Sequence, residues 1–143
     1  MGQRVFEAIR TKVGNEPFAQ KMGLKLEALD EGYSLVTMKF TSDMENIFGM
    51  AHGGAIFAVI DEAFETASNS HGTMAVALNM NITYVAPPSP GETLAAEAKE
   101  INKTNRTANY YITVKNQQGK LLATCQALVY RKKENLPFLT EES

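Results

Sequence analysis

The segment from Gly53 to about Ser68 constrains the possible folds more than any other part of this sequence. It is long enough for four turns of α-helix, and no helix-breaking residue follows its two initial glycines. Apolar side chains fall on nearly every side of this helix until Asp61. A helix that is apolar all round is buried, so the rest of the chain must enclose it.

The rest of the chain is largely strand-like. Segments 24–29 and 33–40 alternate apolar and polar residues around an Asp30-Glu31-Gly32 turn, which predicts a β-hairpin. Further strands are predicted at 75–85, 93–101, 108–114 and 121–130, and a short amphipathic helix at 3–12. The predicted fold class is α+β, in which an antiparallel meander of about six strands wraps around one long central helix.

Length and composition place the chain among ordinary globular proteins. Its 143 residues suit a single domain over 1–143, with an N-terminal helix and loop at 1–20 and a loose tail at 132–143. The net charge of −2 argues against a nucleic-acid partner, and no apolar run approaches the roughly 20 residues that span a membrane. The N-terminus lacks the apolar stretch of a signal peptide, and Cys125 is the only cysteine. We therefore expect a cytoplasmic protein.

The loop before the central helix and the acid within it indicate a candidate site. The loop runs from Asn46 to His52, and Gly53-Gly54 begin the helix. The first N–H groups of a helix have no partner within it, so a helix start attracts negative charge. Burying an unpaired carboxylate costs several kcal/mol, so Asp61 is a candidate base or nucleophile. An anion hole and a carboxylate are the minimal groups needed to attack a carbonyl.

Each of these features also has a purely structural interpretation. The two glycines can serve close helix packing, and a single histidine at a helix start is often a cap or a core hydrogen-bonding group. Asp61 can be kept by a structural hydrogen bond. No metal site is expected, because His52, Asp61, Glu62 and Glu65 lack the paired-histidine spacing of zinc enzymes.

The spacing of Gly53 and Asp61 has a consequence for assembly. Eight residues of helix correspond to a rise of about 12 Å, so one small carbonyl cannot contact both residues of one chain. If both act on the same bond, one must come from a second subunit. A two-fold dimer with antiparallel central helices provides this arrangement.

The pattern Asn46-x-x-Gly49-x-x-His52-Gly53-Gly54, followed by Asp61, resembles the signature of hotdog-fold acyl-CoA thioesterases of the phenylacetate-pathway (PaaI) type. The resemblance continues through 79–84 and through Pro88-x-x-Gly91-Glu92. It implies a hotdog fold and an enzyme that hydrolyses acyl- or aryl-CoA thioesters. It implies no cofactor, since coenzyme A is part of the substrate. It also implies a homo-oligomer, at least a dimer and expected to be a dimer of dimers (a homotetramer).

The resemblance assigns roles to four residues. Asp61 acts as general base on water or as the nucleophile, and the Gly53 N–H of the opposite subunit stabilises the oxyanion. His52 fixes the loop and supports the oxyanion hole, and Asn46 orients the water or the thioester. Some relatives carry a Ser or Thr on the following strand to hold the water, where this chain has Ala77 or Leu78. That difference leaves the positioning of the water open.

Coenzyme A carries phosphates, which predicts a cationic contact. The turn Lys103-Thr104-Asn105-Arg106-Thr107 is the candidate, with Asn105 suited to the left-handed conformation and Arg106 to phosphate; an ordinary solvated hairpin turn is the alternative. Gly54 is a further candidate for substrate contact. The candidates for the acyl pocket are Phe48, Ile56, Phe57 and Phe64, and those along the pantetheine arm are Tyr84, Val85 and Pro88.

Two other functions compete with thioester hydrolysis. Hotdog enoyl-CoA hydratases carry an Asp followed a few residues later by a His, whereas here Asp43 precedes His52 by nine residues. A noncatalytic protein that binds acyl-CoA or another small ligand would not need Asp61. The acid therefore favours the hydrolase.

Overall fold

The computed structural model describes residues 2–139, which form one six-stranded antiparallel sheet and three α-helices. The elements are α1 (Gly2–Gly14), α2 (Pro17–Met22), β1 (Lys25–Asp30), β2 (Tyr33–Lys39), η1 (Ser42–Met44), α3 (Gly53–Asn69), β3 (Thr73–Tyr84), β4 (Thr93–Lys103), β5 (Thr107–Lys115) and β6 (Leu121–Asn135). The six predicted strands, the N-terminal helix and the central helix are therefore confirmed. Within residues 2–139, no helix has the length and apolar character needed to cross a membrane.

The order of the strands across the sheet differs from the predicted meander. The order is β1-β2-β4-β5-β6-β3, and every neighbouring pair is antiparallel. The local hairpins β1–β2, β4–β5 and β5–β6 follow the expected pattern. After β2, however, α3 carries the chain across the sheet, so β3 joins the far edge beside β6. The two edge strands are β1 and β3.

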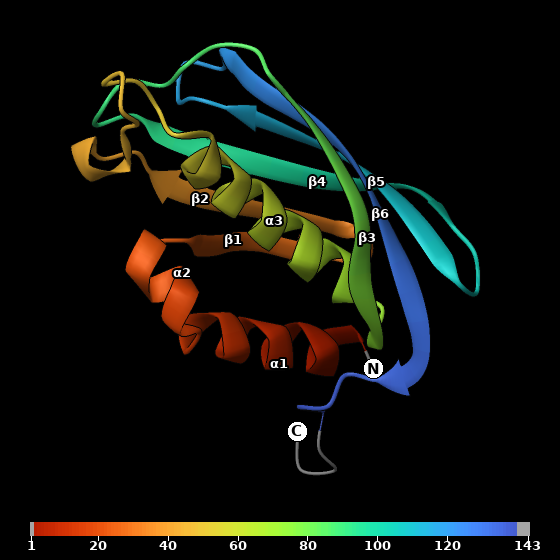
Figure 1. Cartoon of the computed structure of the whole chain (residues 1–143). Helices are drawn as coiled ribbons and strands as arrows, with labels where there is room; N and C mark the ends of the chain where they lie inside the picture. The colour runs from red at the N-terminus through yellow and green to blue at the C-terminus, as the bar shows by residue number, and fades with distance from the viewer. Residues whose placement is uncertain (1, 140–143) are drawn as a thin grey trace.

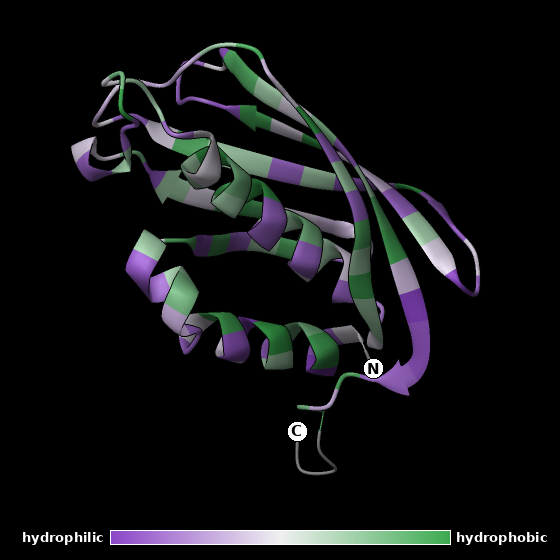
Figure 2. Cartoon of the chain, viewed as in Figure 1, coloured by the Kyte–Doolittle hydropathy of each residue, from purple (hydrophilic) through white to green (hydrophobic). Residues whose placement is uncertain are grey.

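The central helix α3 lies along one face of this sheet (Figure 1). Val59, Ile60 and Phe64 are completely or almost completely buried, and the Phe64 ring meets the Tyr110 ring edge-on at 5.7 Å between centroids. The expectation of burial on nearly every side is wrong for one stripe. Phe57 and Glu65 are exposed and Asp61 is half-buried, and their spacing of four residues places them on one face. Figure 2 shows hydrophilic segments in the second half of this mainly hydrophobic helix.

A second layer covers the end of the sheet and α3. Val5 and Ile9 of α1 are buried in a smaller apolar cluster with Leu29 of β1 and Leu136 after β6. The sequence did not predict α2, where we expected a loop within 1–20. Pro17 supplies a first-turn residue with its φ already set for a helix. Gly23, in the left-handed conformation at φ +73°, ends the helix.

The expectation of a loose tail at 132–143 is wrong for residues 132–139. Strand β6 continues to Asn135, which is paired with Thr73 of β3. Leu136 is 3% exposed, and Phe138 and Leu139 pack beside it. The polar residues 131–135 concealed this part of the strand. It extends past β5, whose pairing with β6 ends at Tyr130, and keeps only β3 as a neighbour, so its residues need not alternate. Residues 140–143 lie outside the described part of the chain.

Candidate active site

Asn46 organises the loop that precedes α3. Its side-chain Oδ1 accepts hydrogen bonds from the backbone N–H groups of Phe48 (2.9 Å) and Met50 (3.1 Å). Its own N–H donates to the Met50 carbonyl at 2.6 Å, and its carbonyl accepts from Gly49, whose φ is +71°. Of the polar groups of Asn46, only the side-chain Nδ2 has no partner within residues 2–139. Any contact of Asn46 with a ligand must therefore use Nδ2, because the loop occupies Oδ1.

His52 caps the start of α3. Its Nδ1 accepts a 2.9 Å hydrogen bond from the N–H of Gly54, and its carbonyl accepts from the N–H groups of Ala55 and Ile56. A ring nitrogen that accepts carries no proton, so the proton of the neutral ring is on Nε2. The structural interpretation of His52 as a helix cap is confirmed, and the exposed ring leaves its Nε2–H free to donate.

Gly53 keeps a free backbone donor at this helix start. Gly54, Ala55 and Ile56 all donate to His52, but the Gly53 N–H donates to no group in the described residues. The carbonyl oxygen of the same residue accepts a hydrogen bond of 3.1 Å from Tyr84 Oη. The helix dipole adds partial positive charge at the same place. Gly53 thus presents the kind of donor that binds a developing oxyanion.

Asp61 lies two turns further along α3, with its carboxylate half-buried. Burial, and to a smaller extent the carboxylate of Glu16, raise the pKa of Asp61 above that of an ordinary aspartate. No hydrogen bond holds its side chain within residues 2–139, so the structural hydrogen bond that would explain its presence is not found there. A desolvated carboxylate free of partners is a better base than one in water.

Asp61 lines a cavity of about 640 Å³. The cavity is mostly apolar: Ile9, Val13, Phe64, Met74, Val129, Leu136 and Phe138 are among its lining residues. Its charged lining residues are Lys12, Glu16, Asp61 and Glu65. The sequence did not predict that α1 and the segment after β6 contribute to this cavity. No local pattern signals it, because these segments meet Asp61 only through the tertiary fold.

Gly53 and Asp61 lie on the same helix and remain separated along it. Eight residues correspond to a rise of about 12 Å and a rotation of roughly 80°, so the free N–H and the carboxylate do not converge on one atom within a single chain. If both groups act on the same thioester, one of them must therefore come from a second subunit.

The predicted acyl and pantetheine residues are in different environments. Phe48 is 78% exposed in the loop, and Phe57 precedes Asp61 by one helical turn on the same face. Val85 is exposed just after β3. Tyr84 contacts Gly53, so it supports the helix start. Pro88 is buried, so it offers no surface to a ligand in this chain.

The predicted phosphate-binding turn is a regular hairpin connection. Thr104 Oγ1 accepts from the N–H groups of Arg106 (3.2 Å) and Thr107 (3.0 Å), and the Lys103 and Arg106 side chains are exposed. The left-handed conformation expected for Asn105 is absent, because within residues 2–139 only glycines have positive φ. The hydrogen bonds to Thr104 shape this turn instead. Figure 1 places it at the opposite end of the sheet from the start of α3, so it does not join the Gly53 region of its own chain.

Comparisons with known proteins agree with this arrangement. Residues 48–123 match the sequence pattern of the Thioesterase superfamily. A putative esterase of Archaeoglobus fulgidus is 41% identical over 86% of this chain and 80% of the relative. The acyl-coenzyme A thioesterase PaaI of Escherichia coli is 33% identical over 92% of this chain and 94% of the relative.

Solved structures give the same result. The E. coli PaaI protein from the phenylacetic acid degradation operon superposes with a TM-score of 0.89 at 31% identity, covering 94% of this chain and 97% of that one. A Streptococcus mutans protein solved with acetyl CoA bound has a TM-score of 0.75 at 26% identity, over 79% of this chain and 91% of that one. The chain therefore belongs to the thioesterase superfamily and has the hotdog fold.

Proposed function

We propose that this protein hydrolyses acyl- or aryl-CoA thioesters to the free acid and coenzyme A. The observation that carries the proposal is the free Gly53 N–H at the start of the same helix that holds the desolvated, unpartnered Asp61. The names of the relatives support the thioester, and the S. mutans structure supports a coenzyme A ligand. No cofactor is needed for this chemistry.

In the proposed reaction, Asp61 takes a proton from a water molecule as the oxygen of that water attacks the thioester carbonyl carbon. The carbonyl oxygen becomes an oxyanion, which accepts a hydrogen bond from Gly53 of the partner subunit. The oxyanion then re-forms the carbonyl as the C–S bond breaks. The thiolate of coenzyme A takes the proton from Asp61 and leaves as the thiol. Direct attack by the Asp61 carboxylate, followed by hydrolysis of the anhydride, is the alternative. One oxyanion donor typically contributes about 3–4 kcal/mol to such a reaction.

The proposal requires at least a dimer, and we expect a dimer of dimers. Two surfaces support self-association. The loop before α3 exposes Ile47 (92%), Phe48 (78%) and Met50 (52%), which is unusual for three apolar side chains so close together. Strand β3 is a sheet edge that exposes Leu78, and an exposed edge is able to pair with a second copy. Both surfaces adjoin the start of α3 or the cavity of Asp61.

Two features bear on coenzyme A and on location. A phosphate contact from Lys103 and Arg106 serves a substrate whose thioester is held by Gly53 of another subunit, because this turn lies at the opposite end of the sheet from the start of α3 in its own chain. Cys125, buried on β6, has no thiol partner in the described chain, which suits the reducing conditions of the cytoplasm.

The test is a thiol-release assay on acyl- and aryl-CoA esters of different sizes. Wild-type protein is expected to release coenzyme A from at least one ester, and Asp61→Asn to lose activity by a factor of at least 100. Glu27→Gln, which changes an exposed acid on β1, is the matched control and should keep full activity. If the wild type binds acyl-CoA but releases no thiol, the noncatalytic binding protein is the correct description.

A mixing experiment tests the shared site. Asp61→Asn subunits are unfolded, mixed with Gly53→Val subunits and refolded together. Each mixed dimer then contains one complete site, made of intact Gly53 from one subunit and intact Asp61 from the other, and one site with both substitutions. A hybrid dimer should therefore have up to half of the activity of a wild-type dimer. Activity no greater than the sum of the two separate variants would place both residues of a site in one chain.

A further inference from the structure

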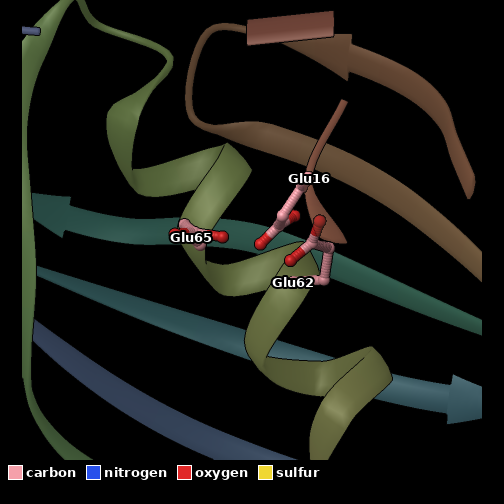
Figure 3. Close-up of side chains that lie close together, drawn as sticks. All are labelled: Glu16, Glu62 and Glu65. Carbon is pink, nitrogen blue, oxygen red and sulfur yellow. The ribbon is translucent and has the colours of Figure 1, made fainter. Parts of the chain in front are cut away.

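Three glutamates meet beside Asp61 but are not used by the proposed reaction. Oxygen atoms of Glu16, Glu62 and Glu65 all lie within 4.8 Å of one another. Figure 3 shows the carboxylates of Glu16 and Glu62 facing each other, with Glu65 on the neighbouring turn of α3. We call these residues the three-glutamate cluster. Glu16 comes from the connection between α1 and α2, 46 residues before Glu62 in the sequence.

Glu62 gives evidence of a missing ligand that is independent of the clustering itself. Its side chain belongs to a residue that is 3% exposed, and its Oε2 atom contacts neither solvent nor any hydrogen-bond partner within residues 2–139. A buried polar atom without a partner costs roughly 1–3 kcal/mol, and a bound water or ion is one of the explanations for such an atom in a native protein.

Among residues 2–139, no basic side chain forms an ion pair with the three-glutamate cluster. Lys12 lines the same cavity, but its Nζ lies 5.6 Å from the centroid of the Phe138 ring. Asp61, the other charged group lining this part of the cavity, adds negative charge.

Glu16 does not use its carboxylate to cap α2. Glu16 is the residue before α2, where a side chain often caps the helix, yet its carboxylate makes no capping hydrogen bond. No helix cap therefore holds its carboxylate away from Glu62 and Glu65. Glu65 is exposed, so the cluster is open to solvent on one side and water can complete a coordination shell.

From this geometry we propose that the three-glutamate cluster binds a divalent cation, with Ca²⁺ as the ion that fits. Oxygens on opposite sides of a Ca²⁺ ion are roughly 4.6–5.2 Å apart, so three oxygens within 4.8 Å can contact one ion. Carboxylate-only ligands select hard cations over zinc or copper. The cation joins the α1–α2 connection to α3 beside the cavity. This inference does not depend on the proposed hydrolysis.

The competing explanation is a proton shared between Glu62 and Glu16 with no ion bound. Burial, the hydrogen bond with Glu16 and the charge of Glu65 raise the pKa of Glu62 well above its ordinary value in the free protein. Cation binding must displace that proton, since a ligating carboxylate is ionised. The two explanations therefore differ in a measurable way.

The test is calorimetric titration of the full-length wild-type protein with CaCl₂, after chelator treatment and dialysis at pH 7.5. We expect saturable binding with a Kd of about 1 mM or lower, release of a proton, and weaker binding at pH 5.5. At ten times the Kd, Ca²⁺ should raise the Tm by about 3–5 °C.

Glu62→Gln is the informative variant. Glutamine resembles the protonated acid, so this variant should fold, yet it should bind Ca²⁺ at least tenfold more weakly and lose the Tm shift. Glu27→Gln, an exposed acid on β1, should bind as the wild type does. The proposal fails if the wild type shows no heat and no Tm shift up to 10 mM Ca²⁺, or if Glu62→Gln binds Ca²⁺ as the wild type does.

Discussion

The Tyr84 hydroxyl donates a hydrogen bond of 3.1 Å to the carbonyl oxygen of Gly53 and so ties the end of β3 to the first residue of α3. A Cβ at residue 53 would lie 3.0 Å from Tyr84 Oη and 3.1 Å from Cζ. A methyl group here therefore fits only if the end of the Tyr84 side chain moves by a few tenths of an ångström, so this contact favours glycine. The φ of Gly53 does not require glycine, since it is not positive.

Gly53→Ala should push Tyr84 away and displace the helix start. We expect a loss of about 1–3 kcal/mol in the free energy of unfolding and a fall in kcat of roughly 10–100-fold. Adding Tyr84→Ala removes the atoms that clash, so the double variant should recover at least half of the lost stability in urea unfolding. Strictly additive effects of the two substitutions would contradict the steric explanation.

His52 variants separate capping from contact with the substrate. His52→Ala removes the cap on Gly54 and should cost about 1 kcal/mol in unfolding free energy. His52→Asn restores an acceptor and should recover most of that stability without replacing the exposed Nε2–H. We expect kcat/KM of His52→Asn to remain at least fivefold below wild type. Full activity in this stable variant would limit His52 to its capping role.

Asn46 variants separate the two ends of its amide. Asn46→Asp keeps the acceptor that holds Phe48 and Met50 but lacks the unpartnered Nδ2 donor. We expect its Tm to change by no more than about 2 °C, while kcat/KM falls at least tenfold. Asn46→Ala should lower both. If Asn46→Asp keeps wild-type kcat/KM, the donor has no role in the reaction.

The raised pKa of Asp61 should appear in the pH dependence of the rate. A base must be ionised, so kcat/KM should fall as pH drops through the pKa of Asp61, with a midpoint above the 3.8 of an ordinary aspartate. Glu16→Gln removes a negative charge that raises this pKa, so the midpoint should move to lower pH. Rates measured from pH 4 to 9 in chelator test both statements. An unchanged midpoint in Glu16→Gln would contradict the coupling.

Glu62 should make stability depend on pH when no cation is present. Because its pKa is raised in the folded state, the folded protein keeps a proton that the unfolded chain has released above about pH 4.5. Stability should therefore be greatest below that pH and fall as pH rises toward the folded-state pKa. Urea unfolding in chelator should show this decline between pH 5 and 9. Glu62→Gln should flatten the curve, and an equal slope in both proteins would contradict the assignment.

Local patterns predicted the elements that depend on local periodicity. Alternation located the β1–β2 hairpin, and the apolar run located α3 to within one residue at its end. The wrong predictions concern segments whose secondary structure depends on tertiary packing. The short helix α2 depends on the burial of Ala19, and the extension of β6 depends on pairing with the start of β3 and on the burial of Leu136.

The motif from Asn46 to Asp61 gave the candidate residues, and the structure specified what their atoms do. In the structure, Oδ1 of Asn46 accepts hydrogen bonds within the loop and Nδ1 of His52 accepts one at the helix start. The N–H of Gly53 donates to no group within residues 2–139. Their catalytic roles remain predictions. Side-chain orientation could not be read from the sequence, since the same residues support several hydrogen-bonding patterns.

The sequence by itself determined a buried central helix, a largely antiparallel set of strands, and a loop, two glycines and an acid at fixed spacing. Tertiary structure decided that β3 pairs at the far edge of the sheet, that Tyr84 meets Gly53, and that Glu16 joins Glu62 and Glu65. The physical reason is that periodicity records which face of an element is buried. Which distant segment covers that face depends on the packing of the whole chain.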